Sequence, residues 1–213
     1  MRRQQRVAYV VAVVVIGVCV LAAPVLAQEN LLADPGFDDP SLASWPPAYV
    51  IQATWLWDPL DRGGSPTSGS GRFENVYAGA TYIVTAEQCV NGVVGGLAFD
   101  AGVHVFFPTG QSATGYGWVQ LVFYTGADCA GTWIDTLSTS LVSEASPGVW
   151  HLSRLTLPAA PEGTASVLFT ISNDKDSSGG SLVIHFDDAF LLLGMFADGF
   201  ESGDTSAWSA TVP

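Results

Sequence analysis

The spacing of apolar residues is the feature that most limits what this 213-residue chain can fold into. Apolar side chains recur at every second position in short segments rich in β-branched and aromatic residues, and Gly, Pro, Ser, Asn and Asp separate those segments. No segment shows the helical period of about 3.6 residues. The segments predicted as strands are 49–55, 72–78, 81–87, 97–107, 116–125, 132–141, 149–157, 165–172 and 181–193. So many strands in one domain-sized length predict an all-β fold, an antiparallel β-sandwich or barrel.

The first 27 residues have the pattern of a secretory signal peptide. Three arginines precede an apolar run over 7–20, and compact residues at 25–27 offer a cleavage site after Ala27. An uncleaved membrane anchor is the alternative, because 7–27 approaches the length of a membrane span. Pro24 would break such a helix, and no basic cluster follows it. We expect cleavage, no membrane span in the remaining chain, and a secreted, cell-surface or periplasmic protein.

The charge of the remaining chain is strongly negative. All 20 acidic residues follow Ala27, against four bases, so the net charge is −16; the bases are Arg62, Arg72, Arg154 and Lys175. Nucleic-acid binding is excluded, because it needs clustered Lys and Arg. Such a surface repels anionic polymers and attracts divalent cations, whereas neutral glycans escape the repulsion.

Two cysteines remain after signal cleavage, because Cys19 leaves with the leader. Cys89 and Cys129 are an even pair in an oxidising compartment. A metal site is disfavoured, since neither cysteine belongs to a C-x-x-C motif. We predict a Cys89–Cys129 disulfide.

Recognisable catalytic motifs are absent from the sequence. It has no nucleophile elbow, zinc-protease motif, P-loop or dinucleotide fingerprint. Histidines lie in separate predicted strands without metal-ligand spacing, and no acidic residue belongs to a catalytic pattern; the residues considered are His104, His151, His185, Glu74, Glu87, Glu144 and Glu162. We therefore expect no enzymatic activity, with an esterase-like or glycosidase accessory enzyme as an alternative.

Several short motifs resemble those of known carbohydrate-binding modules. The opening resembles their "NLL…GFE…W" pattern, and other stretches resemble a small-residue turn, a "G-x-W…P-x-G" stretch and a closing "φ-D-D-V-x-L" strand; the matching residues are 30–32, 35–38, Trp45, 68–72, 148–150, 157–158 and 186–191. Together they span about 28–193 and resemble the galactose-binding-like modules of families four, nine and twenty-two. The resemblance implies a jelly-roll β-sandwich. This chain departs mildly from the pattern at Asp38, where Glu is usual, and at Ala189, where Val is usual.

The same resemblance implies a structural calcium ion that joins the first and last strands. Asp38 and Asp187 match the ligating positions, and Asp188 could substitute if the strand register differs. The alternative is that Asp38 is a turn residue and the Asp187-Asp188 pair is simply solvated. Another acidic segment, 174–179, resembles the start of an EF-hand loop, but its twelfth position is His185, and we interpret it as an ordinary hairpin loop.

An alternating row on one strand is the candidate ligand site. Residues of one parity in 116–125 form a core face, whereas Tyr116, Trp118, Gln120 and Tyr124 share the other face. Exposed aromatic faces with amide partners suit a neutral sugar, which presents apolar C–H faces and a rim of hydroxyls. The predicted site also includes side chains from other segments: His104 from 97–107, and Trp55 and Trp57 as walls. The alternative is that these aromatics are buried, as large aromatics usually are.

The tail at 195–213 repeats the opening pattern of Gly-Phe-acid followed by Trp. It resembles a terminal "DGFESGD-x-S-x-W-S" segment found in exported bacterial proteins. A sorting tag, a docking segment and the remnant of a second module are the competing explanations. We expect this segment to be read by export or surface machinery, or to add to a sheet edge.

The sequence as a whole predicts a secreted, non-catalytic protein that binds a polysaccharide. A cell-surface structural or adhesive protein, using the same fold for protein contacts, is the alternative.

Overall fold

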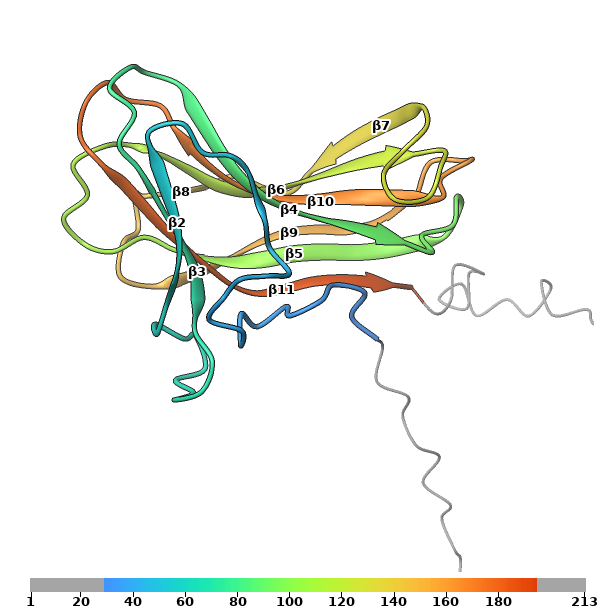
Figure 1. Ribbon diagram of the computed structural model, residues 1–213, viewed down its shortest axis with the longest axis horizontal. Helices are drawn as coiled ribbons and strands as arrows, with labels where there is room; N and C mark the ends of the chain where they lie inside the picture. The colour runs from blue at the N-terminus through green and yellow to red at the C-terminus, as the bar shows by residue number, and fades with distance from the viewer. Residues whose placement is uncertain (1–28, 195–213) are drawn as a thin grey trace, which may run out of the picture.

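The computed structural model describes residues 29–194, which form eleven strands and no helix (Figure 1). The strands are β1 (Pro47–Tyr49), β2 (Ala53–Asp58), β3 (Ser70–Asn75), β4 (Tyr82–Asn91), β5 (Ala98–Phe106), β6 (Gly115–Tyr124), β7 (Trp133–Ser138), β8 (Val142–Ser143), β9 (Trp150–Ala159), β10 (Ser166–Lys175) and β11 (Leu182–Leu193). All nine predicted strands are present, each with shifted ends. Only the short β1 and β8 were not predicted.

The strands form two antiparallel sheets packed face to face. The six-stranded sheet has the order β1-β4-β10-β6-β7, with β8 also paired to β6, and the five-stranded sheet has the order β2-β3-β11-β5-β9. The chain changes sheet after β1, β3, β4, β5, β8, β9 and β10, so most consecutive strands lie in different layers. This arrangement confirms the predicted antiparallel β-sandwich.

The core lies between the sheets and follows the period-two pattern. Residues of one parity in β5 and β6 are fully buried: Phe99, Ala101, Val103, Val105, Val119, Leu121 and Phe123. The rings of Phe99 and Phe123 lie 5.7 Å apart, centroid to centroid, and so join the two sheets. The core face predicted for 116–125 is therefore confirmed, and 97–107 follows the same alternation.

The segment before β1 packs onto the sandwich by its aromatic side chains. Phe37 and Trp45 are fully buried and stack at 5.1 Å, and Trp45 also meets Phe169 of β10 edge-on. Backbone bonds hold this segment along β11, where the Ala189 amide donates to the Pro35 carbonyl. The opening motif thus joins the N-terminal segment to the last strand.

The predicted signal peptide at 1–27 and the tail at 195–213 lie outside the described residues. Residues 29–194 contain no helix with the length and apolar character needed to cross a membrane.

Candidate functional site

The outer face of the six-stranded sheet carries the candidate site. Alternate residues of its three central strands point away from the core because their neighbours point into it. We call this surface the outer face; its residues are Ile83, Thr85, Glu87, Cys89 and Asn91 of β4, Ser166, Leu168, Thr170, Ser172 and Asp174 of β10, and Tyr116, Trp118, Gln120, Val122 and Tyr124 of β6.

Strand register sets these side chains in rows across the sheet. Ser172 pairs with both Thr85 and Trp118, which makes one row. Thr170 pairs with both Glu87 and Gln120 in the next row. Paired residues on adjacent strands lie about 5 Å apart. The middle of the face therefore has the half-buried side chains of Glu87, Gln120 and Trp118, and the Thr170 and Ser172 side chains between them are buried.

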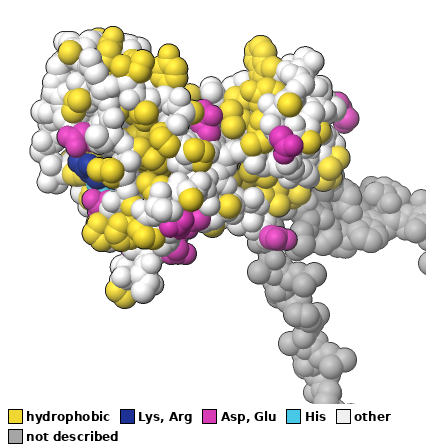
Figure 2. Space-filling model, viewed as in Figure 1, with side chains coloured by type: hydrophobic (Ala, Val, Ile, Leu, Met, Phe, Trp, Pro, Cys, Tyr) yellow, Lys and Arg dark blue, Asp and Glu magenta, His cyan; other side chains and the backbone are white. Residues whose placement is uncertain are grey.

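The sheet that carries this face rises at both ends. In Figure 1, β7 lifts at one end and the loops at the opposite ends of β4 and β10 lift at the other. Figure 2 shows the upper outline of the molecule dipping between two raised shoulders over the middle of the sheet. The outer face is thus a shallow hollow, the shape that ligand sites usually have.

Two carboxylates make this face acidic and partly dehydrated. Burial raises the pKa of the Glu87 carboxyl above its ordinary value, and the Thr85 hydroxyl, which donates to Glu87 Oε1 at 3.4 Å, opposes that shift. Burial, with a smaller contribution from the Asp176 charge, raises the pKa of Asp174. Asp174 Oδ1 and Trp118 Nε1 are buried atoms without a hydrogen-bond partner.

Four of the predicted site residues come together on this face. Tyr116, Trp118, Gln120 and Tyr124 alternate along β6 and are all half-buried, neither sealed in the core nor fully exposed. Sequence reasoning missed the contributions of β4 and β10, above all Glu87, Thr170 and Asp174. The alternation within 81–87 and 165–172 carried that signal, but strand adjacency was needed to use it.

His104 does not lie on the outer face with the four residues of β6. Its strand, β5, belongs to the five-stranded sheet and pairs with β11 and β9, so His104 lies on the opposite surface of the sandwich. There, burial lowers the pKa of its imidazole, and the charge of Arg62 acts in the same direction. The alternation along its strand predicts that His104 points outward, and it does, but on the outer surface of the five-stranded sheet.

Trp55 and Trp57 do not wall the outer face either. Both lie on β2 in the five-stranded sheet and pack against the core. Their indole N–H groups donate to the Trp45 and Phe37 carbonyls at 2.9 and 2.8 Å. They anchor the N-terminal segment, because a buried indole needs a partner for its N–H and these carbonyls supply one.

The predicted disulfide is confirmed, and it bounds the outer face. Cys89 of β4 is bonded to Cys129 in the loop between β6 and β7. Asn91 and Asp128 reinforce the link with reciprocal hydrogen bonds of 2.8 and 2.7 Å. The loop is thereby held against β4 at one end of the face.

The residues predicted to bind calcium lie along the joined first and last segments. Asp187 is buried, and its oxygens accept hydrogen bonds from the Arg62 and Asp188 amides. Burial, outweighing these hydrogen bonds and aided by nearby Asp188 and Asp61, raises the pKa of Asp187 to about 7. A buried carboxylate with acidic neighbours fits a hard cation. Asp38 is exposed, and the Asp188 carboxylate pairs with the Arg62 guanidinium.

Side chains alone do not complete a metal site here. Within residues 29–194, no three His, Cys, Asp or Glu side chains are grouped so that they could hold a metal ion. Calcium also accepts carbonyl oxygens, so Asp187 with backbone ligands is the arrangement that fits it best. The calcium site remains a prediction.

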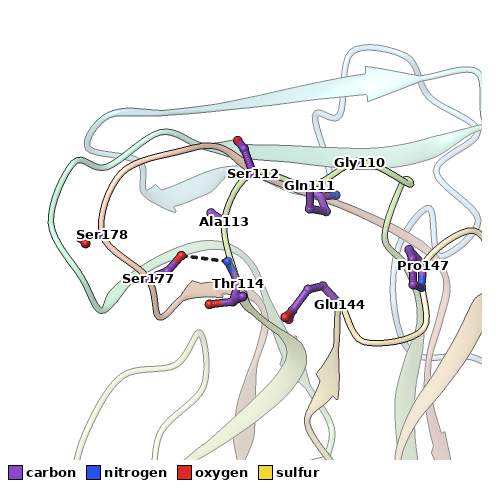
Figure 3. Close-up of a pocket in the computed structure, with 9 residues that line it drawn as sticks. All are labelled: Gly110, Gln111, Ser112, Ala113, Thr114, Glu144, Pro147, Ser177 and Ser178. Carbon is purple, nitrogen blue, oxygen red and sulfur yellow. Dashed lines mark hydrogen bonds between the residues drawn. The ribbon is translucent and has the colours of Figure 1, made fainter.

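A second hollow, of about 440 Å³, lies among the loops at one end of the sandwich (Figure 3). Three loops line it: 107–114, 144–149 and 176–181. Hydrogen bonds fix them together, with the Thr114 amide donating to Ser177 Oγ at 2.8 Å and the Gly115 amide to Glu144 Oε2 at 3.0 Å. Its lining has hydroxyl groups and one carboxylate but no aromatic side chain, so it offers no stacking surface.

Comparison with known proteins identifies the fold. No protein-family model and no curated protein match the sequence. The solved structure of the bacteriophage CBA120 tailspike protein 4 enzymatically active domain matches with a TM-score of 0.58, 14% identity and 78% of this chain. This chain spans 21% of that protein.

Isolated modules match over their whole length. TmCBM61, solved in complex with β-1,4-galactotriose, matches at a TM-score of 0.51 and 14% identity over 78% of this chain and 100% of its own. The C-terminal family 22 carbohydrate-binding module of Clostridium thermocellum Xyn10B matches at 0.52 and 16% identity, over 74% of this chain and 91% of its own. The fold is that of carbohydrate-binding modules. At these identities the likeness concerns the fold alone.

Proposed function

We propose that this chain is a secreted, non-catalytic protein that binds a neutral glycan on the outer face. The observation that carries the proposal is the half-buried row of Tyr116, Trp118, Gln120 and Tyr124 beside the polar residues of β10 and β4. An aromatic ring packs against the C–H face of a sugar, and amide, hydroxyl and carboxylate groups bond to its hydroxyls. The fold shared with TmCBM61, whose structure contains a galacto-oligosaccharide, supports this assignment.

The spacing of acidic residues supports binding without hydrolysis. Glu87 pairs with Thr170, four residues from Asp174 along β10. At about 3.4 Å per residue and 4.8 Å between strands, the Cα atoms of Glu87 and Asp174 are about 14 Å apart. Catalytic carboxyl groups of glycosidases are about 5 to 9.5 Å apart, a separation that these two side chains could reach only by leaning toward each other along the sheet. The two acids of this face are therefore placed to hold a sugar chain at separate points.

Trp118→Ala tests the proposal, with Trp150→Ala as the matched control. Trp150 is also half-buried at an outward position, but on the five-stranded sheet, where it packs against Phe106. On a panel of immobilised neutral polysaccharides, the wild type should be retained. Trp118→Ala should weaken binding at least tenfold, about 1.4 kcal/mol, and Trp150→Ala should leave it unchanged. Thermal melts confirm that both variants fold.

Two results would count against a glycan site here. Equal losses in both variants would mean that the effect is structural, and no retention of the wild type on any polysaccharide would remove the proposal. Capture of proteins by a wild type that ignores glycans would support the alternative, a surface protein that makes protein contacts.

A further inference from the structure

The basic residues of the described chain all lie away from the outer face. Three are surface residues of the other sheet and its loops, each bonded to an acid: Arg62 with Asp188, Arg72 with Glu74, and Arg154 with Asp100. The fourth, Lys175, is fully buried, and its ammonium group donates to the Tyr77 and Ser177 carbonyls. The Lys and Arg side chains visible in Figure 2 likewise lie away from the hollow.

The acids of the outer face consequently have no cationic partner. Glu87 receives only the long hydrogen bond from Thr85, at 3.4 Å. Asp174 has a buried oxygen with no partner, and the nearest charge that acts on it is the like charge of Asp176. Half-buried carboxylates are normally paired, because losing water without gaining a partner is costly. In the free protein, both Glu87 and Asp174 are therefore destabilising in their charged forms.

We infer that the outer face sorts glycans by charge, so that a sugar with a free ammonium group binds more tightly than its neutral counterpart and a uronate binds more weakly. This inference rests on the proposed function, and it names Glu87 as the main specificity-determining residue. Glu87 lies half-way along β4, in the row of Thr170 and Gln120 and next to the row of Trp118. Asp174 makes a second contact near Tyr116, about 14 Å away by strand spacing.

The expected preference follows from ordinary charge energetics. A hydrogen bond from an ammonium group to a carboxylate is stronger than one from a neutral hydroxyl, because both partners are charged. Water at the open side of the hollow reduces the advantage, so we expect a preference of about tenfold. The preference should shrink as salt is added, since salt screens partly exposed charges.

Three trisaccharides with one linkage and one ring configuration test the inference: β-1,4-linked glucosamine, glucose and glucuronate. Calorimetric titrations are made at slightly acidic pH, where the amine is protonated, and in chelator, so that no divalent cation occupies the carboxylates. We expect the affinities to fall in the order glucosamine, glucose, glucuronate. Because the Glu87 carboxylate also accepts hydrogen bonds from neutral sugars, Glu87→Gln should weaken glucose binding as well, but it should lower the ratio of the glucosamine affinity to the glucose affinity to threefold or less.

Glu162→Gln is the matched control, because it removes the same charge from an exposed loop between β9 and β10. It should keep the full preference, which separates a local contact from general attraction to an acidic protein. The inference is overturned if the glucosamine trimer binds no more tightly than the glucose trimer, or if both variants lose the preference equally. Neutral polysaccharides would still be retained in that case, so the proposed function would survive.

Discussion

Asp174→Asn is predicted to stabilise the free protein while weakening its binding to glycans. The wild-type carboxylate has a buried oxygen without a partner and a like charge nearby at Asp176. A buried unsatisfied group costs about 1 to 3 kcal/mol. Asn keeps a polar atom at this position but removes the charge, and Asp174 is only half-buried, so the amide should raise the free energy of unfolding by about 1 kcal/mol. That corresponds to a rise in melting temperature of about 2 to 4 °C for a domain of this size.

The gain should depend on pH with a definite sign. Burial raises the pKa of folded Asp174 above its ordinary value of 3.8, so the folded protein holds this proton more tightly than the unfolded chain does. The wild type is therefore favoured below that ordinary value and loses this stability as pH rises through the folded pKa. The advantage of the Asn variant should be absent well below pH 3.8 and should grow as pH rises until the folded carboxyl is fully ionised.

Urea unfolding followed by tryptophan fluorescence measures both quantities, with Glu162→Gln as a charge-matched control that should change neither. Binding of the Asn variant to a retained polysaccharide should fall about tenfold, because the ligand loses a charged acceptor. An Asn variant that is less stable than the wild type near pH 7 would refute the reasoning. It would mean that Asp174 is satisfied in the free protein by groups other than a ligand.

Three further predictions concern the frame around the face. Replacing both Cys89 and Cys129 with Ala opens a loop of 40 residues, and should lower the free energy of unfolding by about 4 kcal/mol and steepen its urea dependence; an unchanged unfolding midpoint would contradict this. In the presence of a chelator, the free energy of unfolding should fall as pH rises from about 4 to about 7, because the pKa of buried Asp187 is raised to about 7. Calcium added near pH 8 should restore the lost stability. Equal melting temperatures with and without calcium would argue against the calcium site. Gly180→Ala should destabilise the 176–181 loop by roughly 2 kcal/mol or more, because its φ is +68° and a Cβ would lie 2.2 Å from the Ser112 carbonyl oxygen; a thermal melt equal to wild type would contradict the close packing.

Local patterns in the sequence were sufficient for the strands, the buried faces and the disulfide. A side chain's parity within a strand decides whether it points inward or outward, and this depends only on its neighbours in the chain. Val119 and Trp118 could therefore be assigned to opposite faces without coordinates. The Cys89–Cys129 pairing needed only the count of cysteines that follow the predicted signal peptide.

The composition of the site depended on which strands are neighbours. In both β5 and β10 the odd-numbered residues point into the core and the even-numbered ones point outward. Nothing in the local sequence shows that β10 lies beside β6 whereas β5 lies in the other sheet. His104 was therefore placed next to Trp118, whereas β10 and β4 bring Thr170 and Glu87 there instead. Long-range pairing is set by the packing of the whole core and by crossovers between sheets, and these exist only in the folded chain.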